Sequence, residues 1–110
     1  MMSNINTKDW NAFENRQPGP STGNAFYVIG EVETNNGRIQ PVLTKANPQG
    51  VNEKILILDL ALEDQGGFGT ADIAYRPVRY DEQISEGQYT QVQIMYQGEE
   101  VVCIKVSIVS

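Results

Sequence analysis

Residues 55–63, Ile-Leu-Ile-Leu-Asp-Leu-Ala-Leu-Glu, decide the fold of this chain. Leucine occupies every second position of the stretch: Leu56, Leu58, Leu60 and Leu62. Side chains of a strand alternate between its two faces, so this spacing places all four leucines on one face, whereas a helix would scatter them around its axis. Asp59 and Glu63 fall on the other face. The stretch therefore predicts a central β-strand with one face toward the core.

A second run with a period of two covers residues 26–33 and ends shortly before Asn36-Gly37. Asn-Gly is the strongest short signal for a β-hairpin, because a type I′ turn needs positive φ angles at both central residues. The following run, residues 39–43, contains Pro41, which has no N–H to donate to a neighbouring strand. We therefore expect the two runs to form a hairpin whose second strand lies at a sheet edge.

The C-terminal residues predict a second hairpin. Residues 89–97 and 101–109 both alternate, and Gly98-Glu99 between them suits a tight turn. Residues 72–76, further toward the N-terminus, form one more short alternating run that ends at Pro77. The side chains of the second hairpin that we expect to face the core are Val92, Ile94, Tyr96, Val102, Ile104, Val106 and Ile108.

These runs give six or seven short strands joined by turns, and no convincing helix. The fold class that we predict is all-β, an antiparallel β-sandwich of six or seven strands, with a small open barrel as the alternative. The length of 110 residues suits one domain. We expect that domain to span residues 25–110.

Residues 1–24 are predicted to form a flexible N-terminal tail, because Pro, Gly, Ser and Asn crowd their second half. Within the tail, Asp9 could cap a short helical turn that puts Trp10 and Phe13 on one side. These two aromatic residues could fold back and cover an open edge of the core, or they could anchor another chain. The sequence leaves both interpretations open.

The net charge of −6 is concentrated in residues 46–100, which hold ten acidic residues and three basic ones. Such a surface repels phosphate groups, so we expect neither nucleic acid nor a membrane as partner. No apolar run has the length of a signal peptide or a transmembrane segment, which makes the cytoplasm the expected location.

Histidine is absent, and Cys103 is the single cysteine. This composition excludes Ser-His-Asp and Cys-His catalysis, histidine-based metal sites, thiolate clusters and an intrachain disulfide. We therefore expect no cofactor and favour a protein that is not an enzyme. A carboxylate-based hydrolase is the remaining enzymatic alternative: Asp59 interrupts an apolar strand, but it would need a second carboxylate at a defined separation.

A ligand-binding sandwich is another alternative, with calcium or carbohydrate as the ligand. Calcium takes several oxygen ligands from loops, and acidic side chains occur in two loops: Glu63, Asp64 and Asp72 in one, Asp81, Glu82 and Glu86 in the other. A carbohydrate would need an aromatic platform with amide groups beside it. The residues that could supply one are Tyr75, Tyr80, Tyr89, Tyr96, Gln91 and Gln93.

An interaction module is the hypothesis that we favour. In residues 101–109 the face opposite the core set carries Val101, Cys103 and Val109, so this strand is apolar on much of both faces. An open apolar strand invites association, and a symmetric homodimer is the simplest way to cover it. We predict a protein partner, with a second copy of the chain as the first candidate. The predicted partner-binding residues are Trp10, Phe13, Val101, Cys103 and Val109.

Overall fold

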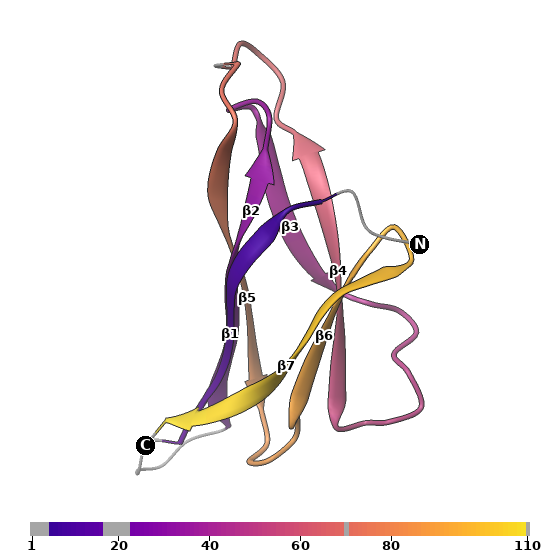
Figure 1. Cartoon of the computed structure of the whole chain (residues 1–110). Helices are drawn as coiled ribbons and strands as arrows, with labels where there is room; N and C mark the ends of the chain where they lie inside the picture. Colours follow the sequence, from indigo (N-terminus) through magenta and orange to yellow (C-terminus); the bar gives the residue numbers. More distant parts are fainter. Residues whose placement is uncertain (1–4, 17–22, 70, 110) are drawn as a thin grey trace.

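Seven strands make up the regular structure of the computed structural model, which describes residues 5–16, 23–69 and 71–109 (Figure 1). These residues contain no helix, and therefore none that could cross a membrane. The strands in chain order are β1 (Thr7–Asn15), β2 (Asn24–Thr34), β3 (Ile39–Lys45), β4 (Ile55–Asp64), β5 (Ala74–Ile84), β6 (Gln91–Tyr96) and β7 (Glu99–Val109).

All seven strands belong to one sheet with the order β3-β4-β6-β7-β1-β2-β5. The sheet curls until its two edge strands, β3 and β5, lie side by side, which makes a nearly closed barrel. The prediction of an all-β fold is confirmed, in the form of the barrel alternative. Two pairings, β4–β6 and β1–β7, are parallel, which the antiparallel prediction did not include. β4 and β6 are parallel because the chain crosses through β5 at the far edge before it returns.

The leucine-rich stretch is the central strand that its sequence predicts. Leu56, Leu58 and Leu60 of β4 are buried, and Asp59 between them is exposed. Leu62 packs at the margin of the same core. The alternation of side chains in a strand therefore sets the face that β4 turns inward.

The prediction of a hairpin at Asn36-Gly37 is wrong, because β2 and β3 do not pair with each other. β2 pairs with β5 along its whole length, from Asn24↔Ile84 to Thr34↔Ala74, whereas β3 pairs with β4. Neither Asn36 nor Gly37 has a positive φ angle. The connection between β2 and β3 carries the chain past β5, because β5 already occupies the free edge of β2.

The hairpin of β6 and β7 is present, with its turn one residue earlier than expected. Gln97 and Gly98 have φ angles of 51° and 80°, which suits a type I′ turn. A bulge between Val102 and Glu100 makes Val101 an extra residue relative to β6. Val101 consequently packs against the core together with Val102, so its expected place on the opposite face is wrong.

The tail predicted for residues 1–24 is wrong for Thr7–Asn15, which form β1 between β7 and β2. The helical turn at Asp9 is also wrong, because Asp9 has a φ angle of 58° and lies in a β-bulge between Lys8 and Asn11. Residues 1–4 and 17–22 of the predicted tail lie outside the described residues.

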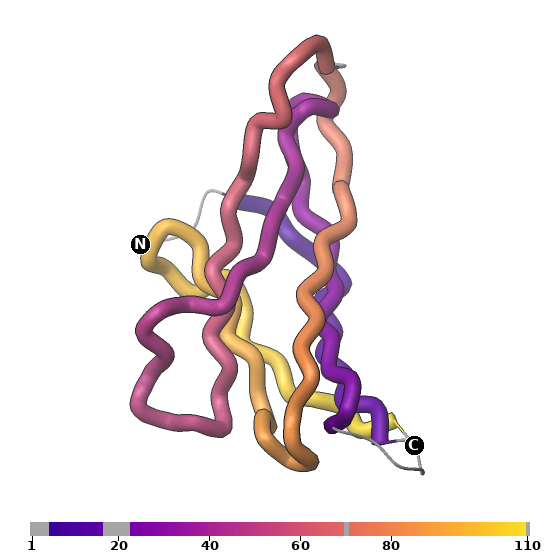
Figure 2. The backbone as a smooth tube through the Cα atoms, turned by 180° about the vertical axis from the view of Figure 1, so that it is seen from behind, coloured from indigo at the N-terminus to yellow at the C-terminus, as the bar shows by residue number. Residues whose placement is uncertain are grey.

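β7 pairs with two neighbouring strands, one after the other along its length. Its first part pairs with β6 and its last part, Val106–Val109, pairs with Ala12–Asn15 of β1. Figure 2 shows the strand passing from the side of β6 to the side of β1. Ile108, predicted to face the core, is 49% exposed at the end of this crossing.

Candidate functional site

The outward side of β1 and β2 carries large apolar side chains at positions where a solvent-facing sheet usually has polar ones. Phe13 and Tyr27 are paired across the two strands, and their ring centroids are 5.1 Å apart. Ile29, two residues along β2, is half-buried, and Pro77 is exposed on β5 at the diagonal position, opposite Glu31. Val109 of β7 is 40% exposed at the other end of this surface. We call Phe13, Tyr27, Ile29, Pro77 and Val109 the apolar strip.

Outward positions of β4 and β6 differ in character. Asp59 of β4 and Gln93 of β6 are polar. Ile57 is apolar, but the loop before β4 lies against it, and the Gln49 side chain bonds to both the N–H and the C=O of Ile57. The apolar strip on β1 and β2 has no such cover among the described residues.

A hollow of about 520 Å³ adjoins the apolar strip. It lies where the bulge at Asp9 interrupts the pairing of β1 with β2, so the bulge accounts for the hollow in the outer face. The residues that line the hollow are Asp9, Asn11, Ile29, Gly30, Glu31, Pro77, Val78 and Arg79. Its floor is apolar, and its charged groups stand at the rim.

The two carboxylates at the rim are free. Neither Asp9 nor Glu31 makes a side-chain hydrogen bond or ion pair within the part of the chain that the structure describes. Arg79 is already engaged, because it bonds to Asp81 at 2.9–3.0 Å and its guanidinium lies 4.6 Å from the Tyr27 ring centroid. The hydrogen bond to Asp81 raises the pKa of Arg79, which therefore stays charged.

The five residues predicted to bind a partner are divided between two sides of the sheet. Phe13 and Val109 lie on the apolar strip, and Cys103 is exposed further along the outer face of β7. Trp10 and Val101 pack against the core instead. Tyr27 and Ile29, which sequence reasoning missed, share the outward parity of β2, but only the pairing with β1 brings them beside Phe13.

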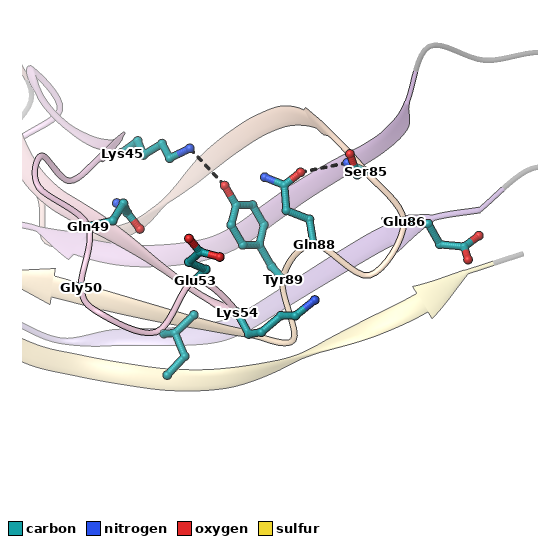
Figure 3. A pocket seen from close by; sticks show the side chains of 10 residues that line it. Lys45, Gln49, Gly50, Glu53, Lys54, Ser85, Glu86, Gln88 and Tyr89 are labelled. Carbon is teal, nitrogen blue, oxygen red and sulfur yellow. Dashed lines mark hydrogen bonds between the residues drawn. The ribbon is translucent and has the colours of Figure 1, made fainter.

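A polar cluster at the end of the barrel is the second place where functional groups gather. Glu82 accepts hydrogen bonds from the hydroxyls of Tyr80 and Tyr89, at 2.7 and 2.9 Å. Lys45 donates a hydrogen bond to the Tyr89 hydroxyl (Figure 3), and the two atoms are 3.1 Å apart. Burial, reinforced by the hydrogen bond to Glu82, raises the pKa of Tyr80, and the hydrogen bond to Tyr89 raises the pKa of Lys45.

This cluster spans the gap between the two edge strands, because Lys45 ends β3 while Tyr80 and Glu82 belong to β5. A hollow of about 490 Å³ lies beside it, between the loop before β4 and the turn before β6. Lys45, Glu82 and both tyrosine hydroxyls already have partners within the protein. The arrangement therefore serves to close the barrel rather than to present reactive groups.

Removing one hydroxyl from this closure should measurably destabilise the protein. Tyr89→Phe keeps the ring beside Phe26 but deletes the bonds to Lys45 and Glu82, so we expect a loss of about 1 kcal/mol. Tyr75→Phe is the matched control, because the exposed Tyr75 hydroxyl has no hydrogen-bond partner among the described residues. Urea unfolding of the three proteins measures the difference; equal midpoints would show that the cluster does not close the barrel.

The alternative sites from the sequence are not assembled. Asp59 is exposed, and its ladder partners are Thr44 and Met95, so neither of the described residues paired with it is a carboxylate. No group of acidic or cysteine side chains within the described residues could hold a metal ion. The four tyrosines do not form one platform, since Tyr89 is buried and Tyr75 lies under the Lys8 ammonium.

The outer face of β1, β2, β5 and β7 thus gathers apolar side chains that no other described segment covers. No protein-family model matches the chain, and comparisons with curated proteins and with solved structures find no match. The fold consequently brings no relative's activity with it.

Proposed function

We propose that this protein is a non-enzymatic binding module that self-associates through the outer face of β1 and β2. The observation that carries the proposal is the apolar strip, which gathers Phe13, Tyr27 and Ile29 on a solvent-facing side of the sheet. Burying such a surface against another protein is favourable because it removes apolar area from water.

The composition of this face supports a protein partner. Protein interfaces are enriched in aromatic residues and arginine at their centre and carry charged groups at their rim. Here Tyr27 and Phe13 occupy the centre, Arg79 lies over Tyr27, and Asp9 and Glu31 stand at the edge. A broad outer sheet face with this pattern suits docking of another folded surface better than binding of a small molecule.

A second copy of the chain is the partner that we propose. A symmetric dimer uses the same patch on both subunits, so an apolar strip in one copy meets an apolar strip in the other. The surplus of acidic groups elsewhere on the chain favours contact through this face, because the acidic surfaces of two copies repel each other.

A charge placed within the apolar strip should weaken this association strongly. Ile29→Glu puts a carboxylate beside Asp9 and Glu31, and we expect the dissociation constant to rise by about tenfold or more. Light scattering across a dilution series measures the molar mass of both proteins, and circular dichroism verifies their folding.

Val42→Glu is the matched control for this experiment. Val42 is a half-buried, outward residue of β3, opposite Ala61, and belongs neither to the apolar strip nor to the lining of the hollow. The Val42→Glu variant should associate with the same dissociation constant as the unmodified protein. An unmodified protein that remains a monomer at every concentration contradicts the proposed function.

A further inference from the structure

The outer face carries unpaired charges of opposite sign on the two sides of β1. Asp9 and Glu31 stand at the rim of the hollow, on the side of β2. Lys105 is exposed on β7, on the other side, and makes no hydrogen bond or ion pair with the described residues. Three free charges on one face, arranged about a central apolar strip, are the elements of a self-complementary interface.

The strand register sets the height of Lys105 on this face. Ser107 is paired with Phe13 in the parallel ladder of β1 and β7. The last pair of this ladder is Ala12↔Val106, after which β7 turns to β6, so Lys105, next to Val106, lies close to the level of Asn11, which is next to Ala12 and lines the hollow. The lysine and the hollow therefore lie at one level, with β1 between them.

A two-fold axis that runs along β1 in the plane of the face exchanges these two sides. In the second copy, the hollow then lies over the lysine of the first, and the reverse holds at the same time. We propose, on the basis of the self-association proposed above, that Lys105 of each subunit enters the hollow of the other and binds between Asp9 and Glu31. Its aliphatic stem lies on Ile29 and Pro77, whose apolar surface forms the floor.

The cationic side chains near the hollow do not bind between Asp9 and Glu31, because each has another partner. Arg79 is engaged by Asp81 and by the Tyr27 ring. Lys8 stands opposite Glu31 in the ladder, but its ammonium lies 4.3 Å from the centroid of Tyr75. Asp9 has a φ angle of 58°, in the left-handed region, as part of the β-bulge that borders the hollow.

Charge reversal tests the pairing. At both contacts of the dimer, Lys105→Glu places a carboxylate against Asp9 and Glu31, and Glu31→Lys places an ammonium against Lys105, so each variant alone should dissociate about tenfold more readily than the unmodified protein. The double variant restores opposite charges at residues 105 and 31, while Asp9 still repels the carboxylate at position 105, so it should recover part of the lost affinity. An equimolar mixture of the two single variants should also form dimers, because residues 105 and 31 then carry opposite charges in both contacts between the different chains. Glu63→Lys, an exposed position on the outer side of β4, is the control and should leave association unchanged.

Light scattering distinguishes failure of the pairing from failure of the function. If the unmodified protein dimerises and Ile29→Glu is a monomer, but reversal and mixing change nothing, the pairing is wrong and the proposed function stands. If single reversals weaken the dimer and neither the double variant nor the mixture recovers it, the pairing is also wrong. An unmodified protein that never dimerises overturns both.

Discussion

Gly30→Ala should destabilise this protein by about 2–3 kcal/mol, because the site has no room for a methyl group. A Cβ atom built on Gly30 would lie 2.6 Å from Cδ2 and from Cζ3 of Trp10 and closer still to Cε3. The indole cannot move freely, since its Nε1 donates a 2.9 Å hydrogen bond to Thr7. Forcing extra volume into a packed core typically costs 1–3 kcal/mol.

The close approach of Trp10 to Gly30 has a structural cause. β7 pairs with β1 only over Ala12–Asn15 and then diverges toward β6. The core between the two strands would be open at that level, and Trp10, re-aimed by the bulge at Asp9, packs there against the core. Gly30 stands opposite the bulge and has no side chain to compete with the indole.

Denaturant unfolding of Gly30→Ala measures the loss, and a second substitution identifies its cause. Trp10→Leu removes most of the ring, so the double variant should be less destabilised than the sum of the two single effects. Ala61→Val, at an exposed position on the outer side of β4, adds two methyl groups and should change stability by less than about 0.5 kcal/mol. Additive effects of Gly30→Ala and Trp10→Leu would contradict the steric explanation.

The sequence was sufficient for features that depend on local alternation. The buried face of β4 could be predicted from Leu56, Leu58 and Leu60 alone, because a period of two is unambiguous in a run of this length. The hairpin of β6 and β7 was also predictable, since its two strands are neighbours in both sequence and space.

Features that depend on distant pairing could not be predicted. Asn36-Gly37 carries a strong local signal, but β5 competes for the edge of β2 and forms the longer ladder. In β1, the bulge at Asp9 shifts the alternation, and the charged Glu14 occupies an inward position, so the strand does not resemble one in the sequence. The apolar strip forms only when β1 pairs with β2, so it could not be predicted from a sequence in which β1 is not recognisable as a strand.

Glu14 is the buried charge that ties the ends of several elements together. Its carboxylate is fully shielded from solvent and accepts hydrogen bonds from Arg16 Nε at 2.8 Å and Asn24 Nδ2 at 2.9 Å. The backbone N–H of Gly87, in the turn before β6, donates to the same group at 3.2 Å. One carboxylate thus joins the end of β1, the start of β2 and a turn that follows it by more than 70 residues.

The pKa of Glu14 determines how this contribution depends on pH. Burial alone would raise the pKa, but the hydrogen bonds from Arg16, Asn24 and Gly87 outweigh it and lower the pKa below the ordinary value of 4.5. The unfolded chain therefore takes up the proton at a higher pH than the folded one. The stabilisation is complete above about pH 4.5 and is lost as the pH falls from there through the lower pKa of the folded protein.

Glu14→Gln should therefore cost about 2–3 kcal/mol near pH 7, because an amide turns a donor toward groups that are themselves donors. The difference from the unmodified protein should shrink as the pH falls below 4.5, since protonation removes the same charge from Glu14. Urea unfolding at a series of pH values measures both effects, with the exposed Glu63→Gln as the control that should remain close to the unmodified protein throughout. A Glu14→Gln variant whose deficit stays constant down to pH 2 would show that the lost stability comes from packing and not from the carboxylate charge.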